Sequence, residues 1–480
     1  MINRLGSRMV LGLWGLVVIG MLQAGEAPIA ERGDGGADSI GEVIQGNAPK
    51  SISEPGVAVL TTFAGDRGTN WKDKPDACGG VGPEHVVDFT TSNFVVHEKK
   101  TGKVIQQTTQ LEFWKKTTPP FDFERMNDPR LLYDPLSKRW FGVHCDLRSG
   151  VGYLAVSKSS DPTADWNAVK LPMERTNPGL KLGVDRNGLY VVYYDASQPV
   201  HSIMTTLAIP IADAIAAEGP RLTRLQTFAK LEMECFPATD LNPNKEADAP
   251  AILLNHDYTE VGFSKMFMHK ITWQGTTASI SAMQTIPLAR TYSAPHPMSN
   301  KNLAVQPAPG AKLQAGEARR TQCVFQHGGS LFTCNGVKRT PDSRCGIYWN
   351  EIRASDGVVL QEGMVDDPDC DYLIPSLAVD ANGNIGLGCT RTSAKEYPSV
   401  CVMIHAAGDP PNSMRPPVAA VKGTTVFTGK RASQHGAGWG SYSSTCLDPS
   451  DPTIFWTYQQ YAASSTPGEY TTSWVAFRRK

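Results

Sequence analysis

The segment LLYDPLSKRWFGVHCD (131–146) sets the pattern that decides the fold of this chain. It contains an apolar run, an aspartate, a short turn and a second apolar or aromatic run, which together predict a β-hairpin. The same order recurs in LGVDRNGLYVVYYD (182–195), LAVDANGNIGLGCT (377–390) and TCLDPSDPTIFWTYQQ (445–460). The turn aspartates are Asp134, Asp185, Asp380 and Asp448. Such a hairpin buries both faces only when copies pack side by side, so the pattern predicts a repeat of small sheets.

Strand-like runs alternate with turns from Val57 almost to the C-terminus, and only residues 212–218 have a helical pattern. The runs group into seven blocks of three or four short strands, which is the content of one β-propeller blade. The blocks are 85–114, 127–172, 181–228, 236–288, 321–365, 373–430 and 439–479. We therefore predict an all-β fold, a β-propeller of seven blades. Six blades is the alternative count, and two β-sandwich domains joined near 300–318 are the alternative architecture.

The last block, 439–479, has only three strands. We expect a strand from the N-terminal segment GVAVLTTF (56–63) to complete it, because closing the ring removes the exposed edges of an open repeat.

The N-terminus has the order of a secretory signal. Arg4 and Arg8 precede the apolar run 9–22, and Ala24 follows as a small residue at a cleavage site. We predict a signal peptide over 1–24, a flexible lead over 25–54 and a propeller domain over 55–480. The apolar run is shorter than the roughly 20 residues of a spanning helix, although an uncleaved anchor is the alternative. The protein is therefore expected to be exported (periplasmic, secreted or at the cell surface), without a membrane span after signal cleavage.

The charge balance excludes two classes of partner. Lys and Arg number 46 and Asp and Glu 47 among 480 residues, so no basic surface is indicated for nucleic acid or an anionic membrane. Hydrophobic residues make up 41% of the chain, which is enough for a sizeable core.

Because exported proteins enter an oxidising environment, the ten cysteines of the chain are expected to form disulfides. Cys323 and Cys334 flank Gly328-Gly329, a hairpin turn that would place them opposite each other. Cys389 and Cys401 bracket a segment symmetrically and are expected to meet across two adjacent strands. The other six cysteines allow 15 pairings; they are Cys78, Cys145, Cys235, Cys345, Cys370 and Cys446.

Four motifs occur in a fixed order: GVGPEH (80–85), DPR with YD and RW (128–140), KLGV (181–184) and WGSY (439–442). They resemble landmarks of secreted bacterial β-propellers, a family mostly of unknown function that is grouped with sialidase-like propellers. The resemblance covers residues 56–480 and implies the fold, with no defined activity. SSDPTADW (159–166) is similar to the Asp-box turn of sialidases, with Thr163 in place of the glycine and Asp165 in place of the threonine. That turn is structural, so the similarity implies a propeller and not an activity.

Propeller topology predicts where a ligand binds. The first strand of a blade starts at one mouth of the central channel and the second strand returns there, so the turn aspartates lie at the far face. The polar and aromatic residues expected at this mouth are Asp128, Arg130, His144, Asp146, Asp195, His256, Asp257, Arg320, Asp371, Tyr372, Trp439 and Tyr442. Together they suit a polar or carbohydrate ligand. Structural roles are the alternative: strand-end turns for the aspartates, ion pairs between blades for the arginines, and packing for the histidines, Trp439 and Tyr442.

These observations predict a monomeric binding or scaffold protein for a glycan or an extracellular protein. The alternative is a divergent sialidase-like glycoside hydrolase that uses carboxylates at the channel mouth. Arg130, Arg320 and Arg353 do not form a recognisable sialidase triad, and no Gly-x-Ser-x-Gly segment is present.

No cofactor is expected, with one exception. Asp366, Asp367 and Asp369 supply a dense set of oxygen ligands for Ca²⁺, although a solvated loop is the alternative.

Overall fold

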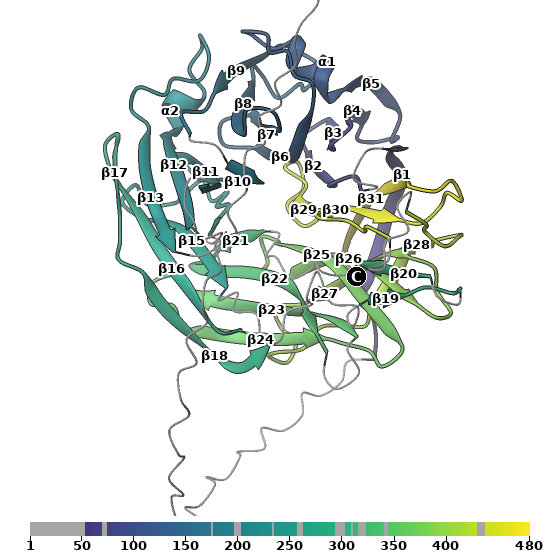
Figure 1. Ribbon diagram of the computed structural model, residues 1–480. Helices are drawn as coiled ribbons and strands as arrows, with labels where there is room; N and C mark the ends of the chain where they lie inside the picture. Colours follow the sequence, from purple (N-terminus) through teal and green to yellow (C-terminus); the bar gives the residue numbers. More distant parts are fainter. Residues whose placement is uncertain are drawn as a thin grey trace, which may run out of the picture. The chain divides into compact units, whose positions relative to one another are not determined.

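The computed structural model describes residues 53–69, 74–173, 176–195, 203–232, 235–256, 263–292, 303–308, 311–314, 323–339, 344–429 and 437–480. These residues form seven small antiparallel sheets arranged as a seven-bladed β-propeller (Figure 1). The prediction of the fold is confirmed, and the sandwich alternative is wrong because no sheet stacks on a partner as a separate domain in the described chain. The predicted signal peptide and nearly all of the predicted lead lie outside the described residues.

The first three blades follow one another along the chain. Blade 1 contains β2 (Cys78–Val81), β3 (His85–Phe89), β4 (Asn93–Glu98) and β5 (Val104–Thr109). Blade 2 contains β6 (Met126–Asp134), β7 (Arg139–Asp146), β8 (Val151–Ser157) and β9 (Trp166–Lys170). Blade 3 contains β10 (Thr176–Val184), β11 (Gly188–Asp195), β12 (Ile203–Pro210) and β13 (Gln226–Glu232).

Blade 4 has a fifth strand and is followed by a short ribbon. It contains β14 (Phe236–Pro237), β15 (Ala251–His256), β16 (Phe263–Gln274), β17 (Thr277–Ile280) and β18 (Gln284–Tyr292). The ribbon pairs β19 (Leu303–Val305) with β20 (Lys312–Gln314). Blade 5 contains β21 (Val324–His327), β22 (Ser330–Lys338), β23 (Cys345–Arg353) and β24 (Val359–Val365). Blade 6 contains β25 (Cys370–Val379), β26 (Ile385–Ser393), β27 (Ser399–His405) and β28 (Val418–Val421).

The N-terminal strand closes the ring in blade 7. This sheet has the order β1 (Val57–Thr69), β31 (Glu469–Arg479), β30 (Phe455–Tyr461) and β29 (Ser444–Leu447). Figure 1 shows β1 in purple beside β30 and β31 in yellow. The register runs from Val57 opposite Arg479 to Thr69 opposite Glu469. The expectation that a strand near 56–63 completes the last blade is therefore confirmed.

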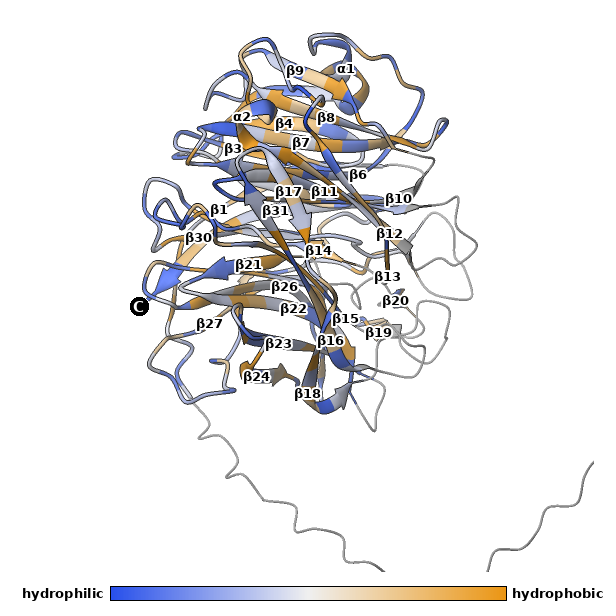
Figure 2. Cartoon of the chain, turned by 90° about the vertical axis from the view of Figure 1, so that its left-hand side faces the viewer, coloured by the Kyte–Doolittle hydropathy of each residue, from blue (hydrophilic) through white to orange (hydrophobic). Residues whose placement is uncertain are grey.

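Apolar side chains fill the spaces between neighbouring blades. One core cluster joins Phe94 of blade 1 to Trp140 of blade 2, and Figure 2 shows the hydrophobic stretches of β4, β7 and β8 inside this part of the molecule. The landmark motif GVGPEH has a packing role here. A Cβ atom at Gly82 would lie 2.6 Å from the Trp140 ring, so only glycine lets the two blades approach this closely.

The turn aspartates of the hairpin repeat hold the backbone of their own turns. The Asp134 carboxylate accepts the N–H groups of Leu136 and Ser137 at 3.0 Å each, and Asp380 accepts those of Asn382 and Asn384 at 2.9 Å. Asp185 and Asp448 do the same in their blades. These bonds end one strand and start the next, which confirms the structural role predicted for the repeat.

Two short helices differ from the expected pattern. Residues Gln110–Lys115 form α1, which the sequence placed in a strand block, because Thr109 and Glu112 form a reciprocal capping box at its start. The second helix, α2 (Ile211–Ala214), begins before the predicted helical segment and ends within it. Among the described residues, no helix has the length and apolar character that crossing a membrane requires.

The ten cysteines are all free thiols. The two pairs argued from spacing are indeed neighbours: Cys389 lies directly opposite Cys401, and Cys323 and Cys334 take the positions next to the Val324–Thr333 pair. The predicted disulfides are not formed in this structure and stay a prediction, whereas the predicted neighbours do lie beside each other. Sequence spacing determines which thiols meet, whereas their oxidation depends on the redox potential around them.

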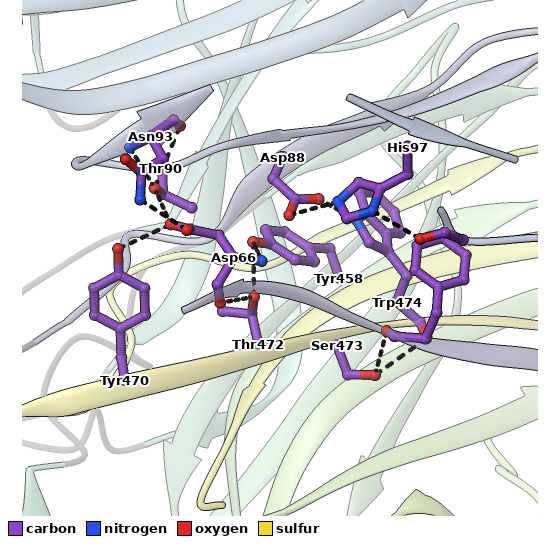
Figure 3. A network of polar contacts seen from close by, with 12 residues as sticks. Asp66, Asp88, Thr90, Asn93, His97, Tyr458, Tyr470, Thr472, Ser473 and Trp474 are labelled. Atoms are coloured by element: carbon purple, nitrogen blue, oxygen red, sulfur yellow. Dashed lines mark hydrogen bonds and ion pairs between the residues drawn. The ribbon is translucent and has the colours of Figure 1, made fainter. Parts of the chain in front are cut away.

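A buried polar network ties β1 to blades 1 and 7 (Figure 3). The Asp66 carboxylate accepts hydrogen bonds from Thr90 at 2.6 Å, Asn93 at 2.8 Å and Tyr470 at 2.8 Å. Close by, the His97 ring contacts the Asp88 carboxylate at 3.0 Å. The Asp66 contacts join β1 to blade 1 and to β31, so they support the closure of the ring, whereas the contact between Asp88 and His97 lies within blade 1.

The His97 contact predicts a pH dependence of stability. Burial lowers the pKa of His97, but the Asp88 carboxylate, the Gly102 carbonyl and Asp66 together raise it above 6.5. Because the pKa of His97 is higher in the folded than in the unfolded state, its protonation stabilises the fold fully below about pH 6.5. This stabilisation is lost as the pH rises through the folded-state pKa. We expect His97→Gln to lower the free energy of unfolding by about 1–3 kcal/mol more at pH 5.5 than at pH 9. Urea unfolding at both pH values measures this difference, which should disappear in an Asp88→Asn background.

Candidate functional site

The inner strands enclose a cavity of about 630 Å³, which we call the channel cavity. Residues of β2, β6, β10, β14, β21 and β29 line it, so six of the seven blades contribute their first strand. Hairpin-turn residues line one end; they are Pro135, Leu136, Asn242, Gly328, Ala381 and Pro449. Most of the other lining residues are apolar. A cavity of this volume with a few polar groups is typical of a small-molecule site.

Arg130 is a buried cation in the wall of this cavity. Its Nε donates to the Leu180 carbonyl at 3.0 Å, one terminal nitrogen donates to Cys78 Sγ at 3.8 Å, and the guanidinium lies 3.6 Å from the centre of the Tyr442 ring. Within the described residues, Arg130 forms no ion pair with a carboxylate. Burial lowers its pKa, but Cys78, Tyr442 and Asp128 together raise it, so the group stays charged.

Lys181 adds a second buried cation to the wall. Its Nζ donates to the Gly179 carbonyl at 3.1 Å and lies 4.4 Å from the centre of the Tyr194 ring and 4.8 Å from that of Phe236. Two aromatic faces therefore stabilise the ammonium group. Arg130 and Lys181 therefore place two cationic side chains in this wall.

Asp448 is the one carboxylate among the described residues that line the cavity. Its oxygens accept hydrogen bonds from Lys99 at 2.8 Å, Ser450 N–H at 2.8 Å and Trp456 Nε1 at 3.0 Å. The hydrogen bonds to its own turn and to the neighbouring blade give this carboxylate a structural role.

The structure describes the side chains of eight of the twelve predicted ligand-binding residues, and Arg130 alone among these eight lines the channel cavity. The side chains of Asp195 and His256, and the whole of Asp257 and Arg320, lie outside the described residues. The other seven, which were expected at a channel mouth, are buried in protein contacts; they are Asp128, His144, Asp146, Asp371, Tyr372, Trp439 and Tyr442.

The acidic residues of that mouth are engaged with the backbone. Asp146 accepts the N–H groups of Arg148 and Ser149 at 3.1 Å each, which is the strand-end turn given as its alternative role. Asp371 accepts the Cys345 N–H at 2.9 Å and pairs with Arg344 at 2.9 Å. Asp128 has a φ of 51° and lies where the register of β6 against β7 shifts, so it belongs to an irregularity of the strand.

The imidazole and aromatic side chains predicted for the site pack inside the propeller. His144 accepts the Trp114 indole N–H at 3.4 Å, and burial lowers the pKa of this imidazole to about 3. Trp439 meets the Phe427 ring edge-on at 5.1 Å. Tyr372 lies beside Cys389 and Cys401, and Tyr442 carries the Arg130 guanidinium on its face. These contacts correspond to the packing roles considered in the sequence.

The described residues contain no group of three or more His, Cys, Asp or Glu side chains placed to hold a metal ion. Asp366 pairs with Arg339 at 3.3 Å, and the Asp367 carboxylate accepts the Asp369 N–H at 2.7 Å. The calcium hypothesis for this loop therefore gains no support.

Sequence reasoning missed Lys181 and the position of the cavity. The lysine stands in an otherwise apolar inner strand, KLGV, which is the signal that would have singled it out. The degenerate Asp box behaves as predicted, since Asp161 holds the Thr163 N–H at 2.9 Å in the hairpin between β8 and β9.

Neither the protein-family models nor the curated proteins give a match to this chain. Solved β-propellers do. The β-propeller domain of the trilobed protease from Pyrococcus furiosus is 11% identical, with a TM-score of 0.41, over 87% of this chain and 94% of that domain. Hsv2 from Kluyveromyces lactis is 11% identical, with a TM-score of 0.34, over 86% of this chain and 97% of Hsv2. The polysaccharide lyase Uly1 is 8% identical, with a TM-score of 0.37, over 72% of this chain and 88% of the lyase. This likeness concerns the fold alone.

Proposed function

We propose that the protein is an exported binding protein that takes a small carboxylate-bearing molecule in its channel cavity. The observation that carries this proposal is Arg130, a buried guanidinium in the cavity wall that pairs with no carboxylate among the described residues. Buried charges in proteins are normally paired, so an unpaired cation in a cavity favours an anionic ligand.

The geometry suits one carboxylate on a compact body. Arg130 has five N–H donors, of which the described contacts use two, so donors remain for a bidentate contact. Lys181 adds a second positive charge to the same wall. The apolar walls then contact the rest of the ligand, which is either a short hydrocarbon acid or the ring of a sugar acid. A sugar acid would agree with the glycan class expected from the sequence.

The glycoside hydrolase alternative is weaker at this cavity. Hydrolysis of a glycosidic bond needs two carboxyl groups about 5–10 Å apart, one as acid and one as base or nucleophile. Asp448 is the single carboxylate among the described lining residues, and Lys99 and Trp456 hold it.

Isothermal titration with matched ligands tests the proposal. We expect glucuronate or benzoate to bind and their neutral counterparts, glucose and benzyl alcohol, not to bind. The two acids separate a sugar-acid site from a site for apolar acids. Arg130→Met should weaken binding of the acid by about 10- to 100-fold, since a charge-assisted contact contributes about 1.5–3 kcal/mol.

Arg344→Met is the matched control, because Arg344 pairs with Asp371 and does not line the cavity. Its affinity for the acid should equal that of the parent protein. If Arg130→Met does not fold, Arg130→Lys keeps the charge without the bidentate fork and should bind with intermediate affinity. Equal binding of acids and neutral counterparts, or no binding by any of the four, overturns the proposal.

A further inference from the structure

Two cysteines meet at the wall of the channel cavity. Val324 pairs with Thr333 across the first hairpin of blade 5, so Cys323 and Cys334 occupy the next positions on the two strands. The two thiols lie close enough for each to affect the titration of the other. Directly opposite residues in an antiparallel pair lie about 4.5–5.5 Å apart at Cα, which is a separation that a disulfide spans.

The two thiols differ in access to the cavity. Cys323 is half-buried and lines the channel cavity, whereas Cys334 lies behind it and is fully buried. A molecule in the channel therefore meets Cys323 first. Cys334 is placed beside the sulfur of Cys323, with which it can react.

The surroundings of Cys323 favour its thiolate. Hydrogen bonding with the Cys334 thiol lowers the pKa of Cys323, and the Leu377 N–H at 3.4 Å and the Arg130 charge act in the same direction against the effect of burial. Burial raises the pKa of Cys334, so its thiol keeps its proton until it reacts. An accessible thiolate with a protonated neighbour is the arrangement of an attacking and a resolving cysteine.

The other thiols near the channel lack one of these features. Burial raises the pKa of Cys78 to about 11 and that of Cys446 to about 12, although both line the cavity. Cys389 and Cys401 face each other in blade 6, but both are fully buried and neither lines the cavity. Cys323 with Cys334 is thus the pair that combines a partner thiol with access.

We propose that Cys323 and Cys334 form a dithiol site that exchanges with low-molecular-weight disulfides entering the channel. The Cys323 thiolate attacks one sulfur of the disulfide RS–SR, forming a mixed disulfide and releasing one RS⁻. Cys334 then attacks Cys323 Sγ, its proton passes to a leaving thiolate, and the second RSH departs. The protein dithiol is oxidised by two electrons to a disulfide, and RS–SR is reduced to two thiols. This inference does not depend on the carboxylate ligand proposed above.

Differential alkylation and mass spectrometry of the full chain test the site. The protein is reduced, freed of reductant and mixed with oxidised glutathione, and the two disulfides are followed in time. We expect the Cys323–Cys334 bond to form at least about tenfold faster than the Cys389–Cys401 bond, because only the first pair is reached directly. Dithiothreitol should reverse the first bond without unfolding the protein.

Variants separate a dithiol site from a merely structural pair. Cys334→Ser should trap glutathione on Cys323, since no resolving thiol remains. Cys323→Ser should remove the fast reaction, and Cys446→Ser, a thiol in the same cavity, should leave it unchanged. The proposal is overturned if both pairs oxidise at the same rate, if the fast reaction persists in Cys323→Ser, or if the bond resists reduction in the folded protein. If Cys323→Ser does not fold, the test is the trapping of glutathione on Cys323 in Cys334→Ser. Absence of trapped glutathione there also overturns the proposal.

Discussion

Replacing Lys245 with methionine is expected to lower the free energy of unfolding by about 3–5 kcal/mol, a large part of the stability of a typical domain. The Lys245 ammonium lies 2.8 Å from the Asp185 carboxylate and 3.2 Å from that of Asp240, and all three groups are buried. It also donates to the Pro250 carbonyl at 3.1 Å. Methionine fills the same space but leaves two buried carboxylates facing each other without a cation.

Urea unfolding followed by tryptophan fluorescence measures this loss. Lys158→Met is the matched control, because Lys158 pairs with Asp165 at the surface and such pairs contribute at most about 1 kcal/mol. Adding Asp240→Asn to Lys245→Met should restore part of the stability, since one of the two uncompensated charges is then removed. A loss below about 1 kcal/mol in Lys245→Met would show that the carboxylates find other partners.

Replacing Asp66 with alanine is expected to cost about 2–4 kcal/mol and to loosen the closing strand. The Asp66 carboxylate is the shared acceptor of Thr90, Asn93 and Tyr470, so its removal leaves three donors in a buried site without their partner (Figure 3). The effect falls on the junction of β1 with blades 1 and 7. The whole ring depends on this junction, because β1 is the strand that completes blade 7.

Hydrogen exchange gives the local readout for Asp66→Ala. Amides of β1 and β31 should exchange faster, while those of blade 4 should keep their protection, and urea unfolding should show the global loss. Asp122→Ala is the control, because Asp122 forms an exposed pair with Lys115 and its loss should change stability by less than about 1 kcal/mol. Unchanged exchange in β1 would contradict the role assigned to the network.

Local pattern was enough to predict most of the blades. Each hairpin encodes its own turn, as the bonds of Asp134 to Leu136 and Ser137 show, so periodicity and turn residues suffice. The closing strand followed from an argument about unpaired edges, which applies to any ring. The short helix α1 was missed because a capping box competes with strand propensity within a few residues.

The candidate site depended on longer-range relations. Arg130 was predicted, but at a mouth of the channel, and its place in the channel wall follows from contacts with Cys78, Leu180 and Tyr442 on other blades. The engagement of Asp371 by Cys345 and Arg344 likewise joins two blades. No spacing along one blade encodes such contacts.

By itself the sequence therefore determined a β-propeller with seven blades, its closing strand, the structural role of the turn aspartates in LLYDPLSKRWFGVHCD and its relatives, and the pairs of neighbouring cysteines. Only the tertiary structure decided that the cavity lies among the inner strands, that Arg130 and Lys181 share its wall, and that Cys323 reaches it while Cys389 and Cys401 do not. The physical reason is the distance along the sequence over which the deciding interactions act. A strand or turn is stabilised by residues close in sequence, whereas a cavity is what remains between side chains of six blades whose packing is set by the whole ring.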